Sequence, residues 1–261
     1  MTRVISGLAL ILLVVGVVVW LPPWATLLLA LVAVIPAVSE LATLGEQGGG
    51  PLPRGLMLVM TAVVLFAGAT SVVPTETVVL SALLVTGCPL VAEARPEEDV
   101  LRRAGLILLP VVYLGLPLGA MVAIRRIDGP MVLLLLLATT IISDTAQYYG
   151  GRQFGRRPLA PRVSPKKTVE GAVSGVVVGG LAFPLLAGPL LPAAPFWLLW
   201  LVGLALVGLG IAGDLFESLL KRSAGVKDSS ALIPGHGGVL DRVDSLLFAA
   251  PFYAGFLASI R

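Results

Sequence analysis

The sequence predicts an all-α integral membrane protein that crosses the bilayer about nine times. Hydrophobic residues make up 57% of the 261 residues and charged residues 13%, whereas about 25% of the residues in a soluble domain are charged. Apolar stretches long enough to cross a bilayer as helices recur from one end of the chain to the other. Helices satisfy their own backbone hydrogen bonds in lipid, and the alternating pattern of a membrane β-barrel is absent.

Prolines, glycines and charged residues separate the apolar runs and set the bounds of the expected helices. The first run ends in Trp20-Leu-Pro-Pro-Trp24, which is typical of an interfacial anchor and turn rather than of a signal-peptide cleavage site. We therefore expect it to be a retained helix. Residues 73–76 are all that separates the third and fourth runs, which form either a hairpin or one broken helix. The expected spans are 4–21, 24–44, 54–73, 75–93, 103–124, 129–149, 168–190, 195–220 and 239–260.

Lysine and arginine are distributed very unevenly between the two sides of this nine-span arrangement. Fifteen of the 18 fall on the side of the N-terminus and the even-numbered loops, and the others are Arg125, Arg126 and Arg261. Cytoplasmic loops carry the excess of positive charge, so we expect a cytoplasmic N-terminus and an external C-terminus. The polar loops 150–170 and 221–242 then both lie on the cytoplasmic face, where their charge suits anionic headgroups and polyphosphates.

One cysteine, Cys88, and one histidine, His236, limit the chemistry that the chain can support. A single cysteine excludes a disulfide framework and a thiolate metal site within the chain. A single histidine without a serine or cysteine in an elbow context argues against a hydrolytic triad or a zinc site. His236 therefore stands as a general base, a metal ligand or a plain loop residue, and we favour contact with phosphate or positioning of the reacting group.

The first polar segment spans residues 142–171. Asp144 lies inside the end of the sixth span, where a carboxylate is costly unless it is paired, bound to a metal or able to reach the headgroups. The six basic residues that follow would by themselves mark topology and contact anionic lipid. Within them, Ser164 is placed to cap a helix that starts near Lys166, and Lys166 and Lys167 at that helix N-terminus would form a phosphate site.

The second polar segment spans residues 213–245. Asp214, Glu217 and Lys221 are spaced i, i+3 and i+7, so they share one face of a helix. Asp241 and Asp244 are spaced i, i+3 at the start of the last span, where helix capping is the simplest role of an aspartate. Carboxylates at the ends of two neighbouring helices also suit Mg²⁺, which prefers oxygen ligands.

Three glycines precede the last span. Gly235, Gly237 and Gly238 allow backbone N–H groups to approach an anion closely, directly before a helix N-terminus. The sequence therefore predicts a phosphate cradle next to the candidate metal ligands.

These residues together resemble the signature of the phosphatidate cytidylyltransferases, the CDP-diacylglycerol synthases. The similarity runs through Ser218-Leu-Leu-Lys221-Arg222, Lys227-Asp228, Pro234-Gly-His236-Gly-Gly and Asp241-Arg242-Val-Asp244. Residues 143–171 are similar to a second typical region of that family. The resemblance thus covers a predicted C-terminal catalytic region, 129–261, whereas the predicted N-terminal region, 1–128, matches only as a string of hydrophobic helices.

The resemblance implies a Mg²⁺-dependent transfer of CMP from CTP to phosphatidate, which gives CDP-diacylglycerol and pyrophosphate. It also implies a homodimer in a bacterial inner membrane, with the active site on the cytoplasmic face, no nucleic-acid partner, and room for a second cation, K⁺ or Mg²⁺. Asp144, Asp214, Asp241 and Asp244 would be metal ligands. The catalytic set would be Asp214, Lys221, Arg222, Lys227, Asp228, His236, Asp241, Arg242 and Asp244. The substrate and phosphate contacts would be Asp144, Ser164, Lys166, Lys167, Thr168, Glu170, Ser218, Gly235, Gly237 and Gly238.

Two other functions compete with this interpretation. One is a related CTP-dependent transferase that acts on an isoprenoid or ether-lipid phosphate. The other is a transporter, because intramembrane acids and glycine-rich broken helices also mark carriers. The halves show no internal repeat, and the polar residues gather at one membrane face rather than at the midplane, which favours the transferase.

Overall fold

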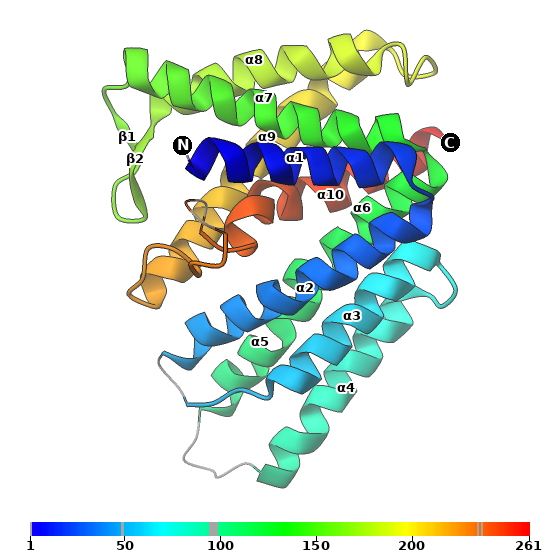
Figure 1. Ribbon diagram of the computed structural model, residues 1–261, viewed down its shortest axis with the longest axis vertical. Helices are drawn as coiled ribbons and strands as arrows, with labels where there is room; N and C mark the ends of the chain where they lie inside the picture. The colour runs from blue at the N-terminus through cyan, green and yellow to red at the C-terminus, as the bar shows by residue number, and fades with distance from the viewer. Residues whose placement is uncertain (1, 48–49, 94–98, 234, 236) are drawn as a thin grey trace.

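The computed structural model describes residues 2–47, 50–93, 99–233, 235 and 237–261 and consists almost entirely of helices (Figure 1). A helix or a continuous helical rod lies in each of the nine apolar ranges. The elements in chain order are α1 (Thr2–Trp20), α2 (Pro23–Glu46), α3 (Arg54–Thr70), α4 (Thr75–Glu93), α5 (Val100–Pro110), the π-helix η1 (Val111–Gly115), α6 (Leu116–Ile127), α7 (Pro130–Phe154), β1 (Pro158–Ala160), β2 (Ser164–Thr168), α8 (Val169–Ala187), α9 (Phe196–Ser223) and α10 (Leu240–Ile260).

Six of these helical rods are long and apolar enough to cross a membrane, counted over the described residues. They are α2, the continuous rod from α5 through η1 to α6, and α7 to α10. The apolar parts of α1, α3 and α4 are shorter. The all-α prediction is therefore confirmed apart from one small hairpin, and the number of crossings stays a prediction.

The third and fourth apolar runs form a hairpin of two helices. Ser71 ends α3 in the left-handed region at φ 58°, and its N–H donates to the carbonyl of Ala67 at 2.9 Å. The chain turns there, so that α3 and α4 lie side by side (Figure 1). Of the two alternatives for residues 73–76, the structure therefore has the hairpin.

The three arginines predicted on the external side lie at one end of the bundle. Arg125 is buried and donates to the carbonyls of Val18 at 2.7 Å and Leu21 at 3.1 Å, which caps the end of α1. Arg261 forms an ion pair with Asp128. Figure 1 shows α1 running from the N-terminus toward this end, where the C-terminus lies.

Helices α7 and α8 pack against each other through glycines of α8. A Cβ atom on Gly175 would lie 2.4 Å from Cγ of Gln147, and one on Gly171 would lie 2.7 Å from the carbonyl oxygen of Gln147. A Cβ on Gly179 would lie 2.9 Å from Cβ of Ser143. These glycines recur every four residues and bring the two backbones together, as small residues do between membrane helices.

The segment before α8 differs from the prediction. Residues 164–168 form strand β2, which pairs antiparallel with β1, so no helix starts near Lys166 and Ser164 does not cap one. Thr168 is the N-cap instead, and its hydroxyl accepts a hydrogen bond from the N–H of Gly171 at 3.1 Å. The correction moves Lys166 and Lys167 from a helix N-terminus to an extended strand.

Two buried apolar clusters hold the helices together. One contains Leu136 of α7, Phe183 of α8 and Tyr253 of α10. The other joins Leu41 of α2 to Leu240 of α10. Because the second cluster includes residues of both predicted regions, the N-terminal helices help to fix the start of α10, where the polar residues gather.

Candidate functional site

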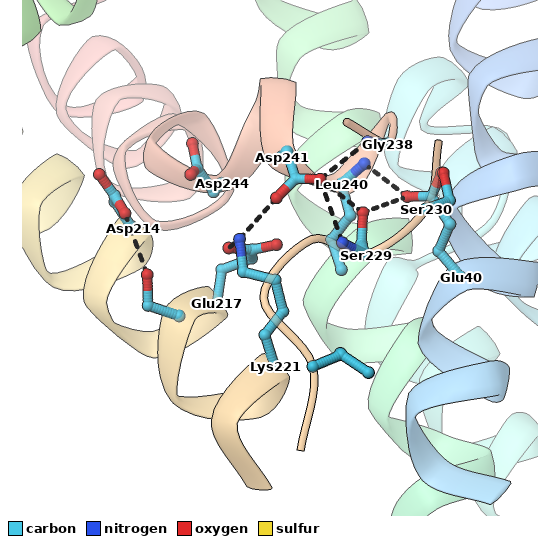
Figure 2. Close-up of polar contacts among 12 residues, drawn as sticks. Glu40, Asp214, Glu217, Lys221, Ser229, Ser230, Gly238, Leu240, Asp241 and Asp244 are labelled. Atoms are coloured by element: carbon cyan, nitrogen blue, oxygen red, sulfur yellow. Dashed lines mark hydrogen bonds and ion pairs between the residues drawn. The ribbon is translucent and has the colours of Figure 1, made fainter. Parts of the chain in front are cut away.

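The polar residues predicted on α9 and α10 meet where the last turns of α9 pass the first turns of α10 (Figure 2). The spacing of Asp214, Glu217 and Lys221 places them along the side of α9 that faces α10, as the helical period predicts. Close packing of the helices makes this contact, since a Cβ on Gly213 would lie 2.5 Å from the carbonyl oxygen of Asp244.

Lys221 joins two carboxylates from different helices. Its ammonium group forms an ion pair with Glu217 one turn earlier on α9, and it lies 2.5 Å from Oδ1 of Asp241 on α10. The side chains are 11%, 0% and 9% exposed, respectively. Buried charges need partners of opposite charge, and the ammonium group and the two carboxylates of this triad are such partners for one another.

Asp241 also accepts three hydrogen bonds on its second oxygen. The N–H of Gly238 donates to Oδ2 at 2.8 Å, and Ser229 donates from its hydroxyl at 2.7 Å and from its N–H at 3.3 Å. Asp241 therefore fixes the loop between α9 and α10 to the first turn of α10, while its other oxygen meets Lys221.

A second acidic group surrounds Lys167, which reaches the site from strand β2. Its ammonium group forms an ion pair with Asp214, which also accepts a hydrogen bond from the Ser218 hydroxyl at 3.5 Å. Asp144 of α7 and Asp244 of α10 interact electrostatically with both Asp214 and Lys167. Three helices and one strand thus bring three aspartates around one ammonium group.

Negative charge is in excess in this site. Asp144, Asp214, Glu217, Asp241 and Asp244 supply five carboxylates, against the two ammonium groups of Lys167 and Lys221. A surplus of carboxylates in a partly buried site favours a bound cation. In the part of the chain that the structure describes, however, no three acidic, histidine or cysteine side chains converge closely enough to hold a metal ion.

A narrow pocket of about 10 Å³, which has room for about one water molecule, lies beside Asp144 between α7, α9 and α10. It is lined by polar residues of α7 and α10 and by apolar residues of α9: Thr139, Thr140, Ser143, Asp144, Gln147, Leu206, Val207, Gly210, Ile211 and Ser245. The carboxylate of Asp244 accepts the N–H of Ser245 at 2.6 Å. Most of the surface of this pocket is apolar.

Glu40 of α2 belongs to the same network and was absent from the candidates that the sequence suggested. It is 5% exposed, and its carboxylate accepts hydrogen bonds from the Ser230 hydroxyl at 2.7 Å and from the Leu240 N–H at 2.9 Å. Its partners lie about 190 to 200 residues away in the sequence. The available signal was a lone acid in an otherwise apolar span, which is a functional candidate by default.

The amides at the start of α10 are engaged by carboxylates of the protein itself. Gly238 donates to Asp241, and Val239 and Leu240 donate to Glu40. Gly235 and Gly237 have positive φ angles of 78° and 79°, as the turn requires. The predicted phosphate cradle stays a prediction, and the Gly238 amide points to a side chain of the protein.

The remaining candidates lie around the site without entering its centre. Arg222 donates to the carbonyls of Val163 and Val226 at 3.2 and 2.9 Å, and so links α9 to the β1–β2 turn. Glu170 accepts the N–H groups of Arg156 and Arg157 at 2.9 and 3.2 Å. His236 lies outside the described residues. Among the described candidates, the exposed ones are Asp144, Lys166, Arg222, Lys227, Asp228, Gly235 and Arg242.

The fold and the site define a polytopic α-helical membrane protein with a charged site at one end of its helix bundle. The chain belongs to the cytidylyltransferase family, whose model matches residues 1–260. It is 39% identical over 181 residues to the phosphatidate cytidylyltransferase of Bacillus subtilis, covering 67% of this chain and 65% of that one. It is 47% identical over 157 residues to the Pseudomonas aeruginosa phosphatidate cytidylyltransferase, covering 59% and 55%.

A third relative, the uncharacterized protein YnbB of Escherichia coli, is 46% identical over 129 residues, which cover 49% of this chain and 43% of YnbB. The chain therefore spans less than two thirds of the length of each of these curated relatives.

Proposed function

We propose that this protein transfers the cytidylyl group of CTP to phosphatidate and releases pyrophosphate, forming CDP-diacylglycerol. The observation that carries the proposal is the site between α9 and α10, where acids and lysines from α7, β2, α9 and α10 meet, with Glu217 and Lys221 buried, in a member of the cytidylyltransferase family. The names of the Bacillus and Pseudomonas relatives supply the substrate class.

The reaction joins two polyanions at a membrane face. A phosphate oxygen of phosphatidate attacks the α-phosphorus of CTP; the bond from that phosphorus to the oxygen bridging to the β-phosphate breaks, and pyrophosphate leaves with the electron pair. The attacking oxygen is already anionic near neutral pH, so no strong general base is required. Positioning and electrostatic stabilisation therefore provide most of the catalysis.

The lysines in the site can offset the negative charge of the two substrates. Lys167 and Lys221 each reach into a group of carboxylates, and both are amine donors that a phosphate can recruit. Arg222, Lys227 and Arg242 lie near the same loop and would contact the triphosphate or the lipid headgroup. The basic residues thereby hold the two substrates together and offset their repulsion.

The donor set fits a divalent cation in its chemistry, because it offers carboxylate oxygens in excess over the ammonium groups. Asp144, Asp214 and Asp244 would hold Mg²⁺, with Asp241 as a further candidate ligand. A bound Mg²⁺ would offset the negative charge of the triphosphate. Lys167, which pairs with Asp214, would contact a phosphate oxygen of the substrate.

The basic end of the bundle is proposed as the cytoplasmic end, with nine crossings, the N-terminus inside and the C-terminus outside. The separation of Arg125, Arg126 and Arg261 from the other basic residues supports this orientation. A bacterial inner membrane and a homodimer remain parts of the proposal that the family resemblance supports.

The test uses the full chain purified in detergent micelles that contain a defined lipid phosphate. With CTP and Mg²⁺, phosphatidate should yield a lipid-linked cytidine product, whereas an isoprenyl phosphate of similar length should not. The matched control is Glu46→Gln, because Glu46 forms a surface ion pair with Arg54 and its other hydrogen bond is to the N–H of Leu52, outside the site. If only the isoprenyl phosphate gives product, then it is the substrate and phosphatidate is not. If neither lipid gives product, the proposed function is refuted.

A further inference from the structure

We propose that Glu40 is a positioning residue that closes the loop between α9 and α10 and sets the orientation of Asp241. The inference rests on the proposed function for its catalytic consequence, although the loop closure can be measured without any turnover.

The carboxylate of Glu40 bridges both ends of this loop. At the start of the loop it accepts the hydroxyls of Ser229 at 3.0 Å and Ser230 at 2.7 Å. At the end of the loop it accepts the N–H groups of Val239 at 3.0 Å and Leu240 at 2.9 Å. Residues nine to eleven positions apart are therefore held together by one side chain from α2 (Figure 2).

Burial makes this bridge strong and specific. Glu40 is 5% exposed and is surrounded along α2 by the buried apolar residues Ala37, Val38 and Leu41. The four donors are neutral, and two of them are amides at the N-terminus of α10, where a negative charge is favoured. Removing the carboxylate would leave several buried donors without an acceptor, which is costly.

Ser229 connects Glu40 to Asp241. Its hydroxyl oxygen lies 3.0 Å from Oε2 of Glu40 and 2.7 Å from Oδ2 of Asp241, while its N–H also donates to Oδ2 of Asp241 at 3.3 Å. A hydroxyl has one proton to share between the two carboxylates. A change at Glu40 therefore alters the position of Ser229 and, through it, the hydrogen bonding of Asp241.

Gly238 shows how tightly these groups are packed. A Cβ atom there would lie 2.1 Å from the Ser229 hydroxyl oxygen and 2.4 Å from Oε2 of Glu40. The absence of a side chain at this position is therefore required by the contact between the loop and Glu40. Gly238 therefore has a structural use in addition to the phosphate contact that the sequence suggested.

Asp241 connects the loop to the rest of the site through Lys221, 2.5 Å from its other oxygen. If Glu40 holds Asp241 in place, loss of Glu40 should weaken the response of the enzyme to Mg²⁺ as well as its turnover. A residue that serves only as an anchor for folding would reduce the fraction of folded enzyme but would leave the Mg²⁺ concentration for half-maximal rate unchanged.

The experiment compares Glu40→Gln and Glu40→Asp with the control Glu46→Gln, in the full-length protein in detergent. Glu46 lies on the same helix but forms a surface ion pair with Arg54, so its loss should change nothing in the site. The measurements are kcat, KM for phosphatidate, the Mg²⁺ concentration for half-maximal rate, and hydrogen–deuterium exchange of the peptide covering residues 229–240.

We expect Glu40→Gln to lower kcat by about ten- to a hundredfold and to raise the half-maximal Mg²⁺ concentration, as loss of a group that orients a metal ligand does. KM for phosphatidate should stay within about twofold. Glu40→Asp should recover part of the turnover. Exchange of residues 229–240 should speed up in Glu40→Gln and stay unchanged in Glu46→Gln.

A Glu40→Gln enzyme with wild-type kcat and Mg²⁺ response would overturn the proposal, even if its exchange were faster. If Glu40→Gln does not fold, Ser229→Ala removes the shared hydroxyl without changing charge, and an unaltered Mg²⁺ response in that variant would equally overturn it. If the wild-type protein makes no CDP-diacylglycerol, the proposed function fails separately. Unchanged exchange in Glu40→Gln would then refute the loop closure itself.

Discussion

Replacing Lys221 by methionine removes the positive charge that joins two buried carboxylates. Glu217 is fully buried and Asp241 is 9% exposed, so water cannot replace the lost ammonium group as the partner of either carboxylate. Asp241 keeps its hydrogen bonds from Gly238 and Ser229, whereas Glu217 loses its ionic partner. Breaking a buried ion pair costs about 3–5 kcal/mol, and we predict about 3 kcal/mol because one of the two acids stays partly satisfied.

The assay is thermal unfolding of the purified protein in detergent. A loss of about 3 kcal/mol corresponds to a fall in Tm of roughly 6–12 °C for a chain of this size. Arg54→Met is the matched control, because it breaks an ion pair whose side chains are 45% and 23% exposed and should cost about 0–1 kcal/mol. Adding Glu217→Leu to Lys221→Met should restore most of the lost stability. A Lys221→Met effect no larger than that of the control would refute the reasoning.

Three further predictions follow from single contacts. Asp214→Asn should lower turnover at least about a hundredfold without lowering the yield of folded protein, measured by transfer of labelled CTP to lipid, and a near-normal rate would contradict its place in the site. Gly175→Ala should lower Tm, at a cost of about 1–3 kcal/mol, because its Cβ would lie 2.4 Å from Gln147, whereas Gly208→Ala, with no atom within 4 Å, should not lower Tm. Thr168→Ala should cost about 1 kcal/mol through loss of the N-cap, and Ser164→Ala should cost less in the same melts; the reverse order would restore Ser164 as the cap.

The helices could be predicted from the sequence because lipid imposes a strong local rule. An apolar run must satisfy its backbone internally, so composition alone sets the helices to within a few residues. The approach of Asp214, Glu217 and Lys221 to α10 was also predictable, since helical spacing puts them on one face. In these cases the relevant information lies within a few turns of the chain.

Other features depend on contacts that the local sequence does not contain. Glu40 meets partners that are 189 to 200 residues away, so its role emerges only when α2 packs against the start of α10. Ser164 and Thr168 are both good N-cap residues, and pairing with β1 decides that the helix begins after Thr168. The assignment of Asp241 as a metal ligand stays a prediction, and its contacts with Lys221, Ser229 and Gly238 could not be read from the local sequence.

The most direct test of cytidylyl transfer follows the two ends of the triphosphate separately. Purified protein is incubated with phosphatidate and Mg²⁺, and with CTP labelled at either its α- or its γ-phosphorus. Attack at the α-phosphorus predicts that the α-label enters the lipid fraction and that the γ-label leaves in pyrophosphate, one for each lipid formed. Entry of the γ-label into lipid, or absence of the α-label from it in a folded preparation, would contradict the proposed function.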